Sequence, residues 1–336
     1  MAGKLTYVKV VLVRGAVVAK LRGNKTERGW RMRTGMILAA LLAAGTARAQ
    51  GADEREAIIA GDPAAQPQTL ALKDVPRATG PARDLFNGRD LAGWEAWLGY
   101  ADPALTFRPQ TVAPLGAVDP SEIFRVVTTD GGPAIRAGGR TWGSLATASD
   151  FADYHLSLEY KWGGLEPGQA RNNGIVYVSH GPAGGVFGTW RSGIEFQLER
   201  GSNGMVIPMG NAMRARTTIA QDRGVRYPFR VFRVGGKAID LANGNPAYSV
   251  EAASQAEKPL GAWNRIDLYV LGNRAVHVVN GVPVMVLEDI AEIGADGRRV
   301  PMTRGRIQLQ AEGAETFFRN IRVEPIAALP TVAVAD

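Results

Sequence analysis

The chain has 336 residues, of which 46% are hydrophobic and 21% are charged, enough for one large domain or two ordinary ones with a sizeable core. It contains no cysteine, which excludes disulfides, thiolate metal sites and cysteine nucleophiles. Residues 1–49 hold ten of the 39 Lys and Arg residues and one of the 32 acidic residues, so they account for the net charge of +7. The remaining 29 basic and 31 acidic residues make a nearly neutral body, which predicts no nucleic-acid partner.

The first 49 residues have the pattern of a targeting segment. Basic residues up to Arg33 precede an apolar run, Met36–Ala44, and Ala47-Arg48-Ala49 offers a small-x-small cleavage site. The apolar run has nine residues, whereas a membrane span needs about 20. We expect residues 1–49 to be an upstream extension plus a secretory signal peptide, with no permanent membrane anchor. The protein is then expected to be periplasmic or secreted.

Composition divides the rest of the chain. Ala, Gln, Asp and Pro dominate residues 50–80, which predicts a flexible tether. Residues 81–326 show no internal repeat and no second linker, so they are expected to form one domain. Residues 327–336 are expected to be a loose tail.

Strand patterns dominate after residue 81. Residues 154–162 alternate strictly between apolar and polar side chains, as in a half-buried strand. Further strands are predicted over 173–179, 194–199, 266–271, 275–279, 282–287, 305–310 and 316–323. Gly272-Asn273 and Asn280-Gly281 are hairpin signals. Many short strands with turn signals predict an all-β fold, an antiparallel β-sandwich or jelly roll with few short helices.

Four groups of segments carry a more specific pattern. They are Leu85–Trp94; Gly143–Thr147 with Asp150–Trp162; Arg171–Ile175 with His180-Gly181 and Gly193–Gln197; and Lys258–Asn264 with Gly305–Ile321. In their order and spacing they resemble the 3-keto-disaccharide hydrolase family, also called domain of unknown function 1080. The resemblance covers about residues 83–325.

This resemblance implies a concanavalin- or LamG-like jelly roll that cleaves 3-keto-glycosides or 3-keto-disaccharides. A C3 ketone acidifies the neighbouring C2–H, so a carboxylate or histidine can remove that proton while donors stabilise the enolate. The C1 aglycone then leaves by elimination, and water adds afterwards. The chain departs from the family at Gly201–Met205, where related sequences often carry a Gly-Asp pair.

Three residues are the candidate catalytic groups. Glu195 lies with Gln197 and Glu199 on one face of a predicted strand, and we assign it as the base or a metal ligand. His180 stands where a strand gives way to a loop and is the candidate acid or base. Glu312 follows a late strand and is the second carboxylate.

Polar and aromatic side chains are the candidate substrate binders. Hydroxyl-binding candidates are Arg171, Asn173, Gln197, Glu199 and Gln310. Trp190, in a glycine-rich loop, is the candidate platform for a sugar ring, and Arg191 beside it is a further candidate for substrate binding. Calcium is a possible cofactor because acid and amide oxygens suit it, although no residue spacing requires a metal.

Two other functions fit the same residues. A sandwich of this kind also serves non-catalytic glycan-binding modules. A retaining glycoside hydrolase using Glu195 and Glu199 is the second alternative, and it requires carboxyl groups about 5–5.5 Å apart. The polar strand face could also be merely solvated. The partner is in each functional case an oligosaccharide or glycoside.

Overall fold

The computed structural model describes residues 68–108, 111–220, 230–243 and 248–335, together with the backbone of two short strands near the start of the chain. The expected cleavage site and most of the expected tether lie outside the described residues. The chain divides into two units, Met1–Gly45 and Thr46–Asp336. In the first unit, β1 (Val11–Val13) and β2 (Ala16–Val18) pair antiparallel. None of the described helical segments has the length and hydrophobicity needed to cross a membrane.

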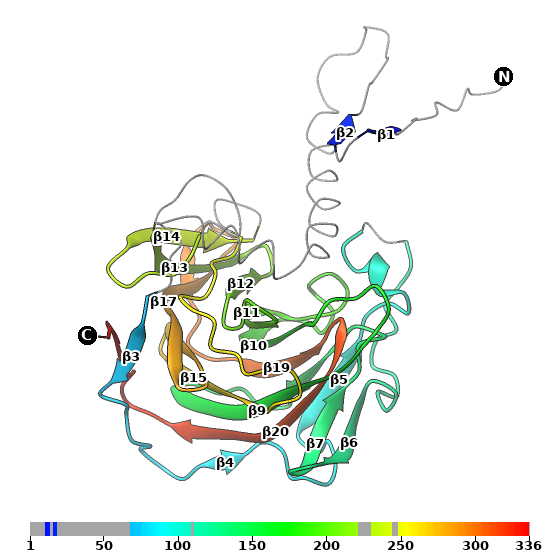
Figure 1. Cartoon of the computed structure of the whole chain (residues 1–336), viewed down its shortest axis with the longest axis horizontal. Coiled ribbons are helices and arrows are strands. Elements are labelled where there is room, and N and C mark those ends of the chain that lie inside the picture. Colours follow the sequence, from blue (N-terminus) through cyan, green and yellow to red (C-terminus); the bar gives the residue numbers. More distant parts are fainter. Residues whose placement is uncertain are drawn as a thin grey trace, which may run out of the picture. The chain divides into compact units, whose positions relative to one another are not determined.

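The second unit contains two main antiparallel sheets, which Figure 1 shows stacked. The six-stranded sheet has the order β12-β11-β10-β19-β8-β5. Its strands are β5 (Trp94–Leu98), β8 (Gly143–Thr147), β10 (Asn172–His180), β11 (Ser192–Glu199), β12 (Val206–Met209) and β19 (Arg306–Ala311).

The eleven-stranded sheet has the order β14-β13-β17-β16-β15-β9-β20-β7-β6, with β18 paired to β17 and β4 paired to β20. Its strands are β4 (Arg83–Asp84), β6 (Phe124–Thr129), β7 (Gly132–Ala137), β9 (Tyr154–Leu165), β13 (Met213–Ile219), β14 (Lys237–Ala242), β15 (Asn264–Leu271), β16 (Arg274–Val279), β17 (Val282–Ile293), β18 (Arg299–Pro301) and β20 (Ala314–Pro325). A 3-10 helix, Pro103–Leu105, is capped by Asp102. The predicted antiparallel β-sandwich of jelly-roll type is therefore confirmed.

Turn chemistry fixes the hairpins that join β15, β16 and β17. Leu271 pairs with Arg274 across the two-residue loop Gly272-Asn273. In the next hairpin Asn280 and Gly281 both have positive φ, 49° and 83°. This conformation is the one that a two-residue type I′ turn needs, and Asn-Gly adopts it at little cost.

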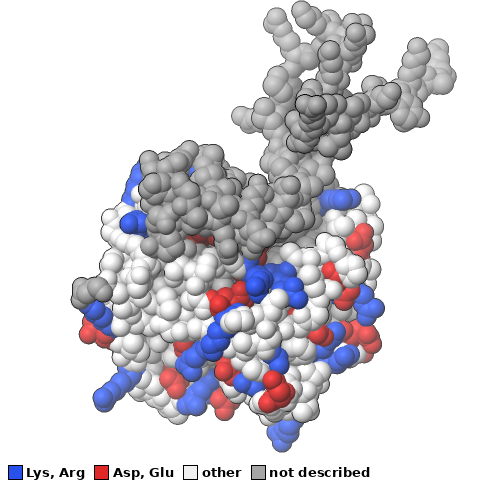
Figure 2. Space-filling view, in the orientation of Figure 1, with Lys and Arg blue, Asp and Glu red and all other residues white. Residues whose placement is uncertain are grey.

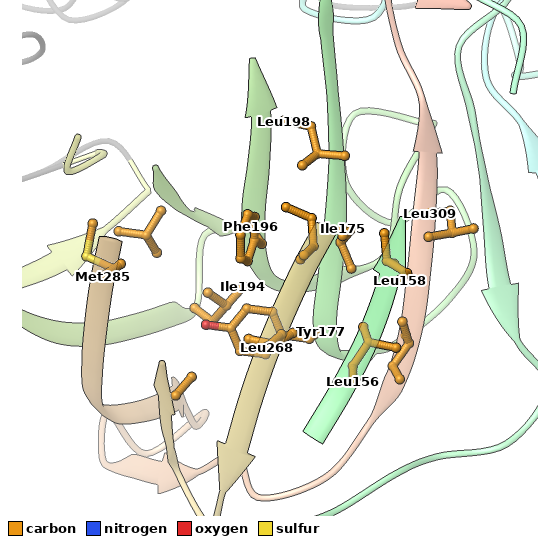
Figure 3. Close-up of a cluster of buried hydrophobic side chains, with 14 of the residues drawn as sticks. Leu156, Leu158, Ile175, Tyr177, Ile194, Phe196, Leu198, Leu268, Met285 and Leu309 are labelled. Carbon is orange, nitrogen blue, oxygen red and sulfur yellow. The ribbon is translucent and has the colours of Figure 1, made fainter. Parts of the chain in front are cut away.

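The core lies between the two sheets. It is formed by every second side chain of each strand, because side chains alternate between the two faces of a sheet. On β9, Leu156, Leu158 and Tyr160 are fully buried, while the side chains between them are only half-buried. Figure 3 shows Leu158 near Ile175 of β10 and Leu309 of β19, and Leu156 near Tyr177 of β10, all within one cluster of buried side chains. Burial of each such side chain stabilises the fold by about 1.5–3 kcal/mol.

The described parts of the expected tether and tail contain a regular element. β3 (Leu70–Lys73) and β21 (Thr331–Val334) pair antiparallel, with Leu72 opposite Val332. These two side chains pack on the cluster of Tyr269 and Val276 on the larger sheet. The expectation of a loose tail is therefore wrong for 331–334, because its apolar residues complete a small hydrophobic cluster.

Acidic and basic side chains are interspersed over the described part of the face in Figure 2. Charged side chains also pair between segments distant in sequence, such as Arg319 with Glu159 at 2.8 Å and Lys161 with Asp130 at 2.7 Å. Pairs of this kind contribute only about 0–1 kcal/mol each when exposed.

Candidate functional site

The strand β11 separates polar from apolar side chains. Ile194, Phe196 and Leu198 enter the core between the sheets. Because side chains alternate along a strand, Glu195, Gln197 and Glu199 lie on the other face, which we call the pocket face. Cross-strand neighbours share a face, so Gly174 opposite Gln197 and Val176 opposite Glu195 also belong to it.

A pocket on this face brings two carboxylates together. Glu195 and Glu312 both line it, and each is almost completely buried, with 3% and 4% of its surface exposed. The other lining residues are Gln197, Phe107, Phe187, Trp190, Met209 and Tyr248. The pocket thus combines an acid-and-amide floor with a wall of aromatic and methionine side chains.

Glycine at position 174 leaves the space in which the side chains of Glu195 and Gln310 meet, although Gln310 itself does not line the pocket. A Cβ there would lie 2.3 Å from Glu195 Oε1 and 2.5 Å from Gln310 Oε1. These two distances place the two oxygens no more than 4.8 Å apart, the sum of both. Gln310 is fully buried, and neither end of its amide has a hydrogen-bond partner among the described residues. A buried amide without partners costs roughly 1–3 kcal/mol, so this position suits a polar ligand.

The neighbouring Gln197 amide orients Glu195. With its nitrogen turned towards the carboxylate, Gln197 donates to Glu195 Oε1 at 2.7 Å and to the Asn173 carbonyl at 3.0 Å. In the opposite orientation the nitrogen faces Glu199 Oε2 at 3.5 Å, the limit of a hydrogen bond. We assign the first orientation because it satisfies the amide better.

Glu312 is held by the start of β10. Its Oε1 accepts a hydrogen bond from Asn172 Nδ2 at 2.7 Å. The next residue, Gly313, has a φ of 75°, and a Cβ there would lie 2.4 Å from the Ala170 carbonyl oxygen. Glycine is therefore required for the chain to bring Glu312 to the pocket.

Trp190 reaches the pocket, but its ring is covered. The side chain is 1% exposed. Its ring centroid lies 6.0 Å from that of Trp142, 6.1 Å from Phe107 and 6.5 Å from Phe187. Trp190 thus forms the back of the wall, and the expectation of an open sugar platform at this residue does not fit its burial.

His180 does not join the two carboxylates. The pairing of β10 with β11 shifts register between Tyr177 and His180, and Val178 has a φ of 44°. After this bulge His180 lies opposite Ser192, which shares the core-side alternation of Ile194. Its Nε2 lies 3.3 Å from Glu292 Oε2, on β17 of the larger sheet. The assignment of His180 to one catalytic group with Glu195 is therefore wrong in geometry.

Asn173 and Arg171 also lie away from the pocket. Asn173 lies opposite Leu198, on the core side of β10, and donates from Nδ2 to Thr316 Oγ1 at 2.9 Å. Because it lies on the core side of the strand, it does not line the pocket. Arg171 precedes β10 and does not line the pocket, and its Nε is buried without a hydrogen bond among the described residues.

Glu199 shares the face of Glu195 but stands four residues away. The register of β10 and β11 is regular over this stretch. At about 3.3 Å per residue their Cα atoms are ~13 Å apart, with side chains roughly perpendicular to the sheet. A retaining glycosidase needs carboxyl groups about 5–5.5 Å apart. Both carboxylates contact the Gln197 amide, at 2.7 Å from Glu195 Oε1 and 3.5 Å from Glu199 Oε2, so they approach each other more closely than their Cα atoms do. A retaining glycosidase that uses this pair stays a prediction.

Arg191 belongs to a separate cluster. Its guanidinium donates to the Gly181 carbonyl at 2.5 Å and to Glu95 Oε2 at 3.3 Å, and Arg306 pairs with the same carboxylate. Burial, together with the charge of Arg306, lowers the pKa of Arg191. Its backbone N–H donates to Gln308 Oε1 at 3.2 Å, so Arg191 anchors the loop rather than lining the pocket.

Several lining residues carry no sequence signal of function. Phe107, Phe187 and Tyr248 stand in loops, and Met209 ends β12. Their common feature is a large apolar side chain outside the periodic strand core, which sequence alone does not distinguish from ordinary packing. In the segment Gly201–Met205, where the sequence differs from the family pattern, Asn203 donates a hydrogen bond to the Tyr160 hydroxyl. This turn therefore supports the core and not the pocket.

No group of three or more His, Asp or Glu side chains able to hold a metal ion occurs in the described part of the chain. Calcium therefore stays a prediction without a specific site.

A pocket that combines a few buried polar groups with aromatic side chains is typical of a small-molecule site. The family model described as 3-keto-alpha-glucoside-1,2-lyase-like domain matches residues 81–324. The chain belongs to this family, which makes it a carbohydrate-active enzyme or a carbohydrate binder.

Solved structures with a similar arrangement share little sequence with this chain. A protein from Parabacteroides distasonis described as a glycosyl hydrolase is 17% identical, with 73% of this chain and 94% of that chain covered and a TM-score of 0.42. Domain 4 of AbnA, a GH43 extracellular arabinanase from Geobacillus stearothermophilus, is 12% identical over 77% of this chain and 95% of that chain, with a TM-score of 0.35. A Bacillus licheniformis β-glucanase is 12% identical over 74% and 100% of the two chains, with a TM-score of 0.35. No curated protein matches the sequence.

Proposed function

We propose that the protein cleaves 3-keto-glycosides by removing the C2 proton of the oxidised sugar and expelling the C1 aglycone. The observation that carries this proposal is the convergence of Glu195 and Glu312 on one buried pocket. Two carboxyl groups can divide the roles of base and acid. Membership of the family supports the choice of a 3-keto sugar as substrate.

In this mechanism the Glu195 carboxylate takes the C2 hydrogen as a proton. The C–H electron pair passes into the enolate of the C3 ketone and then forms the C1–C2 double bond. The C1–O bond breaks, and its electron pair leaves with the aglycone oxygen, which takes a proton from Glu312. Water then adds to the unsaturated 3-keto sugar, so the net reaction is hydrolysis.

Two amides support the base. Gln197 donates to Glu195 Oε1 and fixes the carboxylate over the pocket. Gln310 meets Glu195 above Gly174 with an amide that has no hydrogen-bond partner among the described residues. A substrate oxygen that arrives beside Glu195 would give this amide a partner. The ketone oxygen on C3, the carbon next to C2, fits this role because it becomes the enolate oxygen.

The proposal is tested by incubating the purified protein with a 3-keto-α-glucoside in deuterated water. We expect aglycone release, with solvent deuterium incorporated at C2 of the sugar product. Glu195→Gln is nearly isosteric and should lower turnover by about 100-fold or more, since a positioned base contributes about 10²–10⁴. Binding of the sugar without turnover by wild type would instead indicate a glycan-binding module.

Export is a further part of the proposal. It is supported by the basic and apolar pattern before Gln50. Expression of the full-length chain in a bacterial host, followed by cell fractionation and N-terminal sequencing, tests it. We expect a periplasmic product that begins at or near Gln50, whereas an uncleaved cytoplasmic product would contradict it.

A further inference from the structure

A chain of side-chain contacts connects the two carboxylates of the pocket. One end of the Gln197 amide lies 2.7 Å from Glu195 Oε1, and its other end lies 3.0 Å from the side-chain amide of Asn172. The far end of the Asn172 amide lies 2.7 Å from Glu312 Oε1. Both amides belong to buried residues. Two buried amides in series therefore link the two acids.

Backbone pairing holds Asn172 in this chain of contacts. Asn172 pairs with Glu199, and two residues later Gly174 pairs with Gln197, so the Asn172 side chain shares the pocket face. On its other side Asn172 forms an isolated bridge with Gly313, the residue after Glu312.

The orientation of one amide sets the orientation of the other. An amide donates only through its nitrogen and accepts only through its oxygen, so a nitrogen must meet an oxygen where the two amides touch. In one arrangement Gln197 donates to an ionised Glu195. The Asn172 nitrogen then donates to the Gln197 oxygen, and a protonated Glu312 donates to the Asn172 oxygen. In the other arrangement every hydrogen bond is reversed, so that Glu195 carries the proton and Asn172 Nδ2 donates to an ionised Glu312.

The other two charge states do not fit the chain of contacts. If both acids are ionised, both amides turn their nitrogens outward, and two oxygens meet at 3.0 Å. If both acids are protonated, two nitrogens meet there. Each case leaves buried polar groups without a hydrogen bond, which is costly in a site of this kind. The contacts therefore favour one proton on the pair.

The backbone carbonyl of Asn173 selects the first arrangement. It lies 3.0 Å from the end of the Gln197 amide that faces Glu195. A carbonyl oxygen can only accept, so this end of the amide is the nitrogen. Glu195 is then the ionised acid and Glu312 the protonated one, which are the forms that a base and an acid need.

We propose that Gln197 and Asn172 form a relay that keeps one proton on the two carboxyl groups, with Asn172 as a positioning residue for Glu312. This inference rests on the proposed function and specifies the state in which its reaction starts. When Glu195 takes the C2 proton and Glu312 protonates the aglycone oxygen, the two charges exchange places and the relay reverses. Water addition resets it: the hydroxyl group joins C1, its proton goes to Glu312, and C2 receives a solvent-exchanged proton from Glu195.

Titration of the two carboxyl groups tests the relay without substrate. In protein with ¹³C-labelled glutamate side chains, the signals lost in Glu195→Gln and Glu312→Gln assign the two groups. Asn172→Leu removes the amide at similar volume, so both acids can ionise without an oxygen–oxygen contact. We expect the interval between the two titration midpoints to narrow by about one pH unit or more. Gln310→Met removes an amide beside Glu195 but outside the relay, and should leave the interval unchanged.

A second variant guards against misfolding. Gln197→Met cuts the same relay and should narrow the interval as Asn172→Leu does, and the double variant should narrow it no further. Other titratable or charged groups near the pair are Glu199, whose Oε2 lies 3.5 Å from the Gln197 amide, Tyr248 in the lining and Arg171 beside Asn172. All three remain in every variant, so the comparison isolates the relay.

The outcomes separate this inference from the function on which it rests. An interval that is unchanged in both Asn172→Leu and Gln197→Met would refute the relay and leave the 3-keto chemistry standing. A narrowed interval supports the relay. If the wild-type protein then releases no aglycone from a 3-keto-α-glucoside, the proposed function fails although the relay exists.

Discussion

At the scale of single residues, the absence of one side chain shapes the floor of the pocket. Gly174 has no positive φ, so its backbone does not require glycine. What requires it is the space above it, where Glu195 and Gln310 converge. The sequence alone does not show this role, because a glycine inside a strand usually indicates a bulge or a close backbone approach.

Gly174→Ala should therefore damage the site and spare the fold. The new Cβ would lie 2.3 Å from Glu195 Oε1, so the carboxylate must move. A displacement of about 1 Å can cost ~100-fold in rate, and we expect kcat/KM to fall at least tenfold with an almost unchanged Tm. Gly164→Ala is the control, because a Cβ there meets no atom closer than 3.8 Å. Equal activity of both variants would refute the placement of Glu195.

His277 is a buried titratable residue with a structural role. It is completely buried, it hydrogen-bonds with the Tyr177 hydroxyl at 2.9 Å and with the Gly204 carbonyl at 3.0 Å, and it stacks on Phe196. Burial lowers its pKa to about 4. The ring therefore stays neutral in the folded protein at pH values where it is protonated in the unfolded chain.

This difference predicts a loss of stability in mild acid. The unfolded histidine has a pKa of about 6.5, so the contribution is present above pH 6.5 and declines as the pH falls towards 4. Between pH 7 and pH 5 the free energy of unfolding should fall by about 2 kcal/mol through this group. Urea unfolding of wild type and His277→Gln at both pH values measures it. A pH dependence that is equal in both proteins would contradict the assignment.

At the scale of elements, periodicity predicts strands well and their irregularities poorly. The alternation of β9 and the Asn-Gly hairpin are local signals, and both appear as predicted. The bulge at Val178 is not local, because it depends on how β10 pairs with its neighbours. A shift of one residue turns a side chain to the opposite face. This is why His180 leaves the pocket although its position at a strand end was predicted.

The strand β21 was not predicted from composition, because residues 327–336 were expected to be a loose tail. Val332 packs against the cluster of Leu72 and Tyr269, whereas Thr331 points to the other side and is exposed. Val332→Asp should therefore lower the free energy of unfolding by roughly 2 kcal/mol through lost apolar burial. Thr331→Asp adds the same charge to the same strand and should change it by less than about 0.5 kcal/mol. Equal effects in thermal melts would show that β21 is not anchored there.

At the scale of the whole molecule, the fold follows from the sequence more completely than the site does. Each half-buried strand has one apolar face that must be covered. Many such strands therefore form two sheets that pack these apolar faces against each other. The site requires two segments 117 positions apart, at Glu195 and Glu312, to meet on one face. The alternation of β11 predicts the face of Glu195, but only the paired sheet brings Glu312 and the loop aromatics to it.

The most direct test of this account is the exchange of the C2 hydrogen of a 3-keto-α-glucoside with solvent deuterium, followed by mass spectrometry. We expect wild type to incorporate deuterium at C2 during aglycone release, and Glu195→Gln to lose both signals together by about 100-fold or more. Aglycone release by wild type that is undiminished in Glu195→Gln would contradict the role of this carboxylate as the base.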